Sequence, residues 1–393
     1  MYKKILFCLD NSDDANAGID LGLAVASACG ASVAGCHIYA ARLHNDRFRQ
    51  MEGGLPARYR TEEGIKRQRE VHDTLITRGL KIISDSYAAP FLAKARAFGL
   101  DSSGVSREGK NFEELTDEAR EGGYDLAVLG AHGLGRVRTS RVGSVCERVV
   151  RRAASDVLVA RANAPDGGDA PIAVAMDGSP ASFGGLKAAC SLSRALGHPV
   201  TAVASFDPDF HHTAFRAIAG VLTEEAGRIF KFNEQERLHE EIIDKGLARI
   251  YRDHLDTAVS LGAEAGVAVT PVLLSGKASQ SLIEYAQRTP PFLLVLGKTG
   301  AHASRSLDIG SVTENCLRET ACNLLISTRA FTPAPKARAQ GPEWSEEASR
   351  ILDRIPAFAR GVVRNMVEDA ARGQHIDEIT AEFMRKTREK LDG

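Results

Sequence analysis

The chain has 393 residues, which is enough for two or three domains with full hydrophobic cores. Its composition, 44% hydrophobic and 26% charged, is typical of globular proteins, and no apolar run is long enough to span a bilayer. The net charge of −1 provides no electrostatic attraction to nucleic acid or to an anionic membrane. Seven scattered cysteines without C-x2-C spacing favour neither a disulfide framework nor a zinc ribbon, so we expect a cytoplasmic protein.

The first 162 residues alternate strand and helix patterns. Five strands are predicted, at 4–9, 31–38, 90–98, 125–129 and 156–160. Helices are predicted at 15–29, 111–121 and 145–153. The charged stretch 41–85 favours helix and is interrupted by Gly53-Gly54 and Pro56.

After a linker of Ala, Asp, Gly and Pro at 164–171, the same order of elements begins again. Strands are predicted at 172–176, 199–205, 267–274, 292–296 and 323–327. Helices are predicted at 180–196, 278–288 and 311–320. Residues 210–265 form a long, mostly helical insertion between the second and third of these strands.

One glycine pattern, G-x2-G-x9-G-S, occurs at the end of the fourth strand in each half. The two copies are Gly130, Gly133, Gly143 and Ser144, and Gly297, Gly300, Gly310 and Ser311. Every member lies 167 positions before its counterpart, and the same offset separates Asp10 from Asp177, which end the first strands. A constant offset indicates an internal duplication, and alternating strands and helices predict parallel, doubly wound sheets.

In such sheets, ligands bind at the carboxyl ends of the strands, where both the aspartates and the glycine loops are expected. Backbone N–H groups of the loops and of the following helix could bind phosphates, and the aspartates could accept hydrogen bonds from ribose or adenine. The alternative is structural: tight turns for the glycines and helix capping for the aspartates. Basic side chains in the loops would favour phosphate, namely Arg136, Arg138 and Arg141 in the first and Lys298, His302 and Arg305 in the second. The second loop also contains Asp308, which is less favourable for a polyphosphate.

The strand-Asp-x-Ser and strand-G-x2-G-x9-G-S-helix arrangement resembles the universal stress protein family of the ATP-binding type, present here as a tandem pair in 1–162 and 170–330. The resemblance implies five-stranded parallel sheets in the order 3-2-1-4-5, with ATP, ADP or AMP between the first and fourth strands, with or without Mg. In the first half it implies a site of Asp10, Ile38, Leu129, Gly130, Gly133, Gly143, Ser144 and Val145. In the second half it implies Asp177, Ser205, Leu296, Gly297, Gly300, Gly310, Ser311 and Val312. Asn11 departs from the glycine usual after the first aspartate, which Gly178 keeps.

Beyond a Pro- and Ala-rich linker at 331–343, residues 344–393 predict three helical pieces forming a small all-α domain. Trp344, Ile355-Pro356, Phe358 and Glu368 stand in a string that resembles the small C-terminal domain of the light-independent protochlorophyllide reductase B subunit. The rest of that enzyme has no counterpart in this chain, so a docking module is expected rather than reductase activity.

The favoured interpretation is a nucleotide-binding stress-response protein whose two halves pack as a pseudo-dimer. No nucleophile-and-base motif occurs, so we expect no enzyme, with slow or partner-dependent ATP hydrolysis left open. The histidines of the insertion, His211, His212, His239 and His254, are expected at the surface rather than on a metal. The alternative function is an interaction scaffold that recruits an unknown protein partner through the helical insertions or the tail.

Overall fold

The computed structural model describes residues 1–137, 139–165, 168–207, 244–301, 303, 307–334, 342–355, 357–374 and 376–392. The chain forms two compact units. The first comprises residues 1–207 and 251–332, and the second comprises 208–250 and 333–393. Arg138, His302 and Arg305 lie outside the described residues, as do His211, His212, His239 and the part of the predicted insertion up to residue 243.

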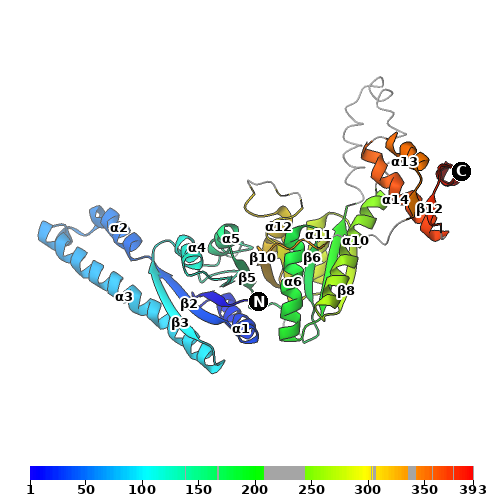
Figure 1. The fold of residues 1–393 in the computed structure, drawn as a ribbon. Helices are drawn as coiled ribbons and strands as arrows, with labels where there is room; N and C mark the ends of the chain where they lie inside the picture. The colour runs from blue at the N-terminus through cyan, green and yellow to red at the C-terminus, as the bar shows by residue number, and fades with distance from the viewer. Residues whose placement is uncertain are drawn as a thin grey trace, which may run out of the picture. The chain divides into compact units, whose positions relative to one another are not determined.

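The first half contains five parallel strands in the predicted order 3-2-1-4-5 (Figure 1). The strands are β1 (Lys4–Cys8), β2 (Ser32–Tyr39), β3 (Ser102–Glu108), β4 (Leu126–Gly130) and β5 (Asp156–Ala160). The connecting helices include α1 (Asp13–Cys29), α4 (Asn111–Glu121) and α5 (Ser144–Arg152). Helix α1 begins where the Ser12 side chain accepts a hydrogen bond from the Ala15 N–H, and it ends at Gly30 with φ of 63°.

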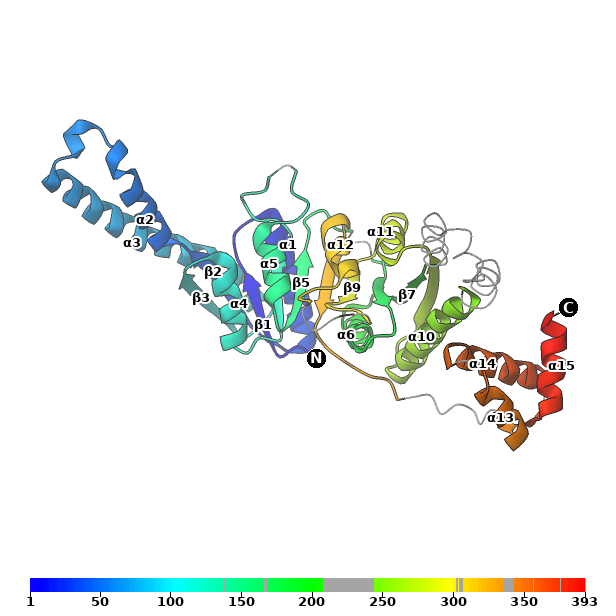
Figure 2. The same ribbon diagram turned by 90° about the horizontal axis from the view of Figure 1, so that it is seen from above.

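The strand predicted at 90–98 is wrong, because these residues belong to α3 (Glu62–Ala97), and β3 follows at 102–108. Ala88, Phe91 and Ala95 are buried at helical spacing on one side of α3, which packs on the sheet where Phe91 contacts Phe7. The helix continues through Pro90. Proline has no backbone N–H, so one helical hydrogen bond is missing there, but the helix does not end. Helix α2 (Ala41–Met51) and the outer part of α3 run side by side beyond the sheet (Figures 1 and 2), held by stacking of Phe48 on His72.

The second half repeats the order 3-2-1-4-5. Its strands are β6 (Ile172–Met176), β7 (Val200–Phe206), β8 (Val269–Ser275), β9 (Leu293–Gly297) and β10 (Asn323–Ser327). Its described helices are α6 (Pro180–Leu196), α10 (Asp244–Glu264), α11 (Ala278–Arg288) and α12 (Ser311–Glu319). Helix α10 takes the place of α3 as the crossover before the third strand of the half.

The two five-stranded sheets join into one sheet of ten strands through antiparallel pairing of β5 with β10. Leu158 pairs with Leu325, its own counterpart at the offset of 167 residues, so the join is symmetric about this pair. Helices α1, α3, α6 and α10 cover one face and α4, α5, α11 and α12 the other, and each face has a continuous apolar core running through both halves. This architecture fits the predicted doubly wound fold, with a continuous sheet in place of two separate ones.

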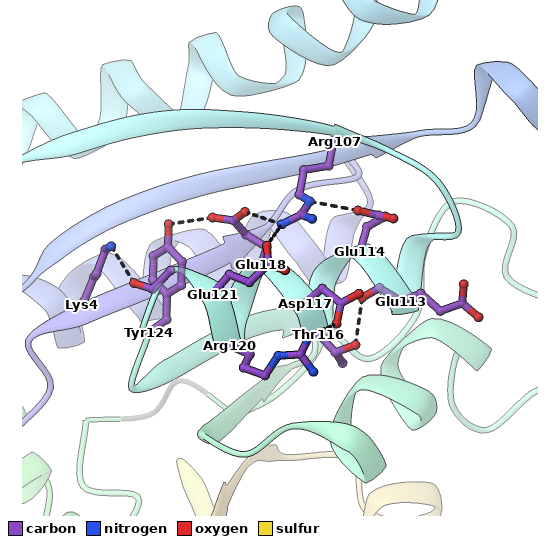
Figure 3. A network of polar contacts seen from close by, with 11 residues as sticks. Lys4, Arg107, Glu113, Glu114, Thr116, Asp117, Glu118, Arg120, Glu121 and Tyr124 are labelled. Atoms are coloured by element: carbon purple, nitrogen blue, oxygen red, sulfur yellow. Dashed lines mark hydrogen bonds and ion pairs between the residues drawn. The ribbon is translucent and has the colours of Figure 1, made fainter.

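An ionic network fixes the edge of the first half (Figure 3). Arg107 of β3 contacts three carboxylates of α4: Glu114 at 2.9 Å, Glu118 at 3.0 Å and Glu121 at 2.9 Å. Glu118 also accepts a hydrogen bond from the Tyr124 hydroxyl. The network ties the outermost strand of this half to the helix that crosses the sheet.

The described part of the second unit contains a small helical fold, as expected. Its helices are α13 (Glu346–Asp353), α14 (Ala357–Gly373) and α15 (Ala381–Asp392), joined by a short parallel pair of β11 (Glu343–Trp344) and β12 (Glu378–Ile379) that the sequence analysis did not predict. The Trp344 indole N–H donates to Glu368 at 3.1 Å, which satisfies a carboxylate that is only 5% exposed. No helix among the described residues is long and apolar enough to traverse a membrane.

Candidate functional site

A cavity of about 480 Å³ opens at the carboxyl ends of β1 and β4 in the first half. Parallel strands place their carboxyl ends at one edge, so Asp10 after β1 and the glycine loop after β4 meet there despite their separation in sequence. All of the residues predicted for this half line the cavity: Asp10, Ile38, Leu129, Gly130, Gly133, Gly143, Ser144 and Val145.

Asp10 and Gly133 are in close approach across the cavity. One carboxylate oxygen of Asp10 accepts from the Ser12 N–H at 3.0 Å and from the Ser12 hydroxyl at 2.6 Å. The other oxygen faces Gly133, where an added Cβ would lie only 2.6 Å away. A Cβ at position 133 would therefore displace the Asp10 carboxylate, whose second oxygen lies close to the loop backbone. Asn11 adopts φ of 59°, much like Gly178 at 79°, so the departure at Asn11 preserves the backbone conformation.

The start of α5 supplies backbone donors to the cavity. Gly143 is the N-cap residue of α5 and offers no side-chain hydrogen bond to the first turn, while Ser144 and Val145 line the cavity. Free N–H groups at a helix N-terminus bind anions. The Gly143 N–H itself donates to the Ala131 carbonyl at 2.7 Å, which holds the helix start against the end of β4. This arrangement suits a phosphate group.

The two described arginines of the first loop, Arg136 and Arg141, have different partners. Arg136 lines the cavity, whereas Arg141 forms an ion pair with Glu319 of the second half. Arg141 is therefore engaged away from the cavity in this structure. Among the described loop residues, Arg136 is the cation available to a ligand of the first half.

Sequence reasoning missed two aromatic side chains of the cavity wall, His37 and Tyr87. Their rings are 4.4 Å apart between centroids, and His37 Nδ1 lies 2.9 Å from the Ser84 hydroxyl. Burial lowers the pKa of His37, so its ring favours the neutral form. Tyr87 lies on α3, and recognising that helix from the spacing of its apolar residues would have placed this side chain beside the second strand.

Three thiols also line the cavity: Cys8, Cys36 and Cys146. Burial raises the pKa of Cys36 and of Cys146 to about 12 and that of Cys8 well above its usual value. Neutral buried thiols are poor nucleophiles and poor metal ligands, so they fit an apolar lining better than a redox site. No cluster of three or more His, Cys, Asp or Glu with metal-binding geometry occurs in the part of the chain that the structure describes.

The second half has a smaller cavity, of about 250 Å³, at the corresponding edge. It is lined by all of the residues predicted there: Asp177, Ser205, Leu296, Gly297, Gly300, Gly310, Ser311 and Val312. Asp177 accepts from the Ser179 N–H at 2.9 Å and the Ala301 N–H at 2.8 Å, and a Cβ at Gly300 would lie 2.7 Å from its carboxylate. The close approach of an aspartate carboxylate to a glycine of the loop thus occurs in both halves.

The second cavity differs in its surroundings. Tyr251 of α10 lines it, and His254 of α10 packs against Gly178, so His254 is a half-buried contact rather than a surface side chain. The Lys298 ammonium donates to the Ala153 carbonyl at 2.7 Å, and Asp308 pairs with Arg151 at 3.0 Å. The partners Ala153 and Arg151 belong to the first half. These two charged side chains of the second loop therefore serve the join between the halves.

Two family models match the chain. The model of the "Universal stress protein family" matches residues 1–161 and 170–328, and the model described as "Proto-chlorophyllide reductase 57 kD subunit" matches residues 344–388. No curated protein matched the sequence.

Several solved structures share the fold, among them the following two. A universal stress protein from Archaeoglobus fulgidus DSM 4304 is 14% identical with a TM-score of 0.52, covering 83% of this chain and 98% of its own. A protein described as functionally unknown from Pseudomonas aeruginosa PAO1 is 13% identical with a TM-score of 0.52, covering 83% of this chain and 92% of its own. With family matches over both halves of the ten-stranded sheet, the chain belongs to the universal stress protein family.

Proposed function

We propose that the first half binds ATP or a related adenine nucleotide and that binding serves a regulatory, stress-response role in the cytoplasm rather than efficient catalysis. The observation that carries the proposal is the cavity in which Asp10 and Gly133 face each other beside the uncapped start of α5. The Asp10 carboxylate would accept hydrogen bonds from the ribose, and the N–H groups of the loop and of α5 would bind the phosphates. Any Mg²⁺ would be bound through the phosphate oxygens.

The first half is the stronger candidate of the two. Its cavity is larger, at about 480 Å³ against about 250 Å³, and Arg136 lines it. Both cavities contain the equivalent aspartate, Asp10 or Asp177, but the described lining of the second cavity includes no Lys or Arg to offset the charge of a polyphosphate. We therefore propose that the second half stabilises the first as the partner in a pseudo-dimer, which the β5–β10 pairing supports.

Isothermal titration with ATP, ADP and AMP tests the proposal. Gly133→Ala places a Cβ against the Asp10 carboxylate and should abolish binding, whereas Gly54→Ala, at an open position outside the cavity, should bind like the wild type. Absence of binding by the wild-type protein would refute the nucleotide function. Normal binding by Gly133→Ala would refute the site.

An interaction scaffold remains the second candidate, because α3 exposes large apolar side chains beyond the sheet. Val71, Leu75 and Ile82 are 55%, 67% and 66% exposed. Protein capture by the full chain can be compared with capture by a Val71→Ser, Leu75→Ser, Ile82→Ser variant. If the variant captured the same proteins as the wild type, the exposed apolar side chains of α3 would not be a binding surface, and this function would lose its support.

A further inference from the structure

The Asp14 carboxylate joins three segments of the first half. One oxygen accepts from the Ala162 N–H at 2.8 Å, just after β5. The other accepts from the His132 N–H at 3.0 Å and lies 3.0 Å from His132 Nδ1, in the glycine loop. Because both oxygens are engaged and the side chain is only 13% exposed, this carboxylate is not presented to a ligand.

His132 in turn closes the neck of the glycine loop. Its ring is 8% exposed and lies between Asp14 on one side and the Ser140 carbonyl, 3.3 Å from Nε2, on the other. Residues 132 and 140 are the two ends of the loop segment that contains Gly133 and Arg136. The ring therefore fixes the distance between the ends of this segment, and Gly133 follows directly on the anchored residue.

The anchor is specific to the first half. The positions 167 residues beyond Asp14, His132 and Ser140 are Ala181, Thr299 and Leu307, none of which can reproduce it. In the second half Ala181 packs closely on Gly297, and the loop is attached instead by the Thr313 hydroxyl, which donates to the Gly297 carbonyl at 2.7 Å. The two copies share the glycines and the aspartate but hold their loops differently.

We infer that Asp14 and His132 are positioning residues that hold the first glycine loop in the conformation that binds phosphate. The inference rests on the proposed nucleotide function and explains why one copy of a shared motif would bind a polyphosphate better than the other. Asp14 does not line the cavity and His132 does, so Asp14→Ala tests positioning without loss of a lining residue. Loss of the anchor would widen the neck and move the loop N–H groups, while the ribose side of the cavity at Asp10 would remain.

The experiment measures ATP and adenosine binding by the wild type, Asp14→Ala, His132→Asn and Asp13→Ala. Asp13→Ala is the matched control, because Asp13 is in the same first turn of α1 but is exposed and is not among the residues that line the first-half cavity. Asp14→Ala and His132→Asn should weaken ATP binding by about tenfold or more, which corresponds to about 1.4 kcal/mol, with adenosine affinity unchanged. Amide hydrogen exchange of residues 133–142 in the ligand-free protein should accelerate in the same two variants and not in Asp13→Ala.

Two results would overturn the inference. One is ATP affinity in Asp14→Ala and His132→Asn within about twofold of the wild type; the other is an equal loss for ATP and adenosine, which indicates general damage. Failure of the wild type to bind ATP at all would instead refute the proposed function. The two failures are therefore distinguishable in one data set.

Discussion

Glu147 of α5 and Arg318 of α12 form an ion pair of 2.5 Å across the join between the halves, and Glu314 and Arg151 form its repeat, also at 2.5 Å. Each residue of the second pair is the counterpart of one in the first, 167 positions away. The polar contacts beside the strands repeat in the same way: the Thr328 N–H donates to Asp156 and the Arg161 N–H to Asn323. The contacts at the join are thus repeated, because each half uses the counterparts of the residues that the other half uses.

Removing one member of this cluster should destabilise the first unit. Arg151→Ala removes the partner of Asp308 and leaves Glu147 and Glu314 with Arg318 alone, and we expect a loss of about 1–2 kcal/mol, allowing for partial solvent exposure. Urea denaturation measures the change. Lys94→Ala, which removes an exposed pair with Asp20, is the control and should change stability by less than about 0.5 kcal/mol. Equal effects of the two variants would contradict the structural importance of the cluster.

Arg107 should be the residue of the edge network that is least tolerant of change. It is 26% exposed and holds three carboxylates of α4 together. Arg107→Gln leaves like charges adjacent and should cost about 1–3 kcal/mol, whereas Arg107→Lys keeps the charge but loses the planar geometry and should cost less. Thermal unfolding of the two variants measures this ranking of stabilities. A greater loss of stability for Arg107→Lys than for Arg107→Gln would contradict it.

The stability of the protein should fall in alkaline solution because of its buried thiols. The pKa of Cys146 rises from 9.0 to about 12 on folding, since burial disfavours the thiolate. The folded state therefore retains the proton, so the stabilisation is complete below about pH 9 and is lost as the pH rises toward 12. Cys146→Ser should flatten the decline of unfolding free energy above about pH 9, as measured by urea denaturation. An identical decline in the variant would argue against this origin.

The main features of the site could be predicted from local sequence patterns. Two short-range signals indicated the site: glycines directly after an apolar strand, and an aspartate at the end of another strand. The constant offset of 167 residues showed that both signals are repeated. Residues 90–98 were predicted as a strand although they belong to helix α3, because their local pattern is weak and the burial of Phe91 against Phe7 depends on tertiary packing.

Other features depend on contacts between distant segments. The pairing of Leu158 with Leu325 and the ion pair of Arg141 with Glu319 follow from the way the two halves meet, which no local pattern encodes. For the same reason Arg141 was predicted for phosphate, although in the structure it contacts the other half. The packing of His254 against Gly178 likewise requires the course of α10 to be known.

We propose that the two copies of the motif have diverged and that the nucleotide binds in the first. Native mass spectrometry of the protein saturated with ATP tests it directly, using the wild type, Gly133→Ala and Gly300→Ala, which add a Cβ at equivalent positions against Asp10 and Asp177. We predict one ATP per chain for the wild type and for Gly300→Ala, and none for Gly133→Ala. Loss of ATP from Gly300→Ala with retention by Gly133→Ala would contradict the account.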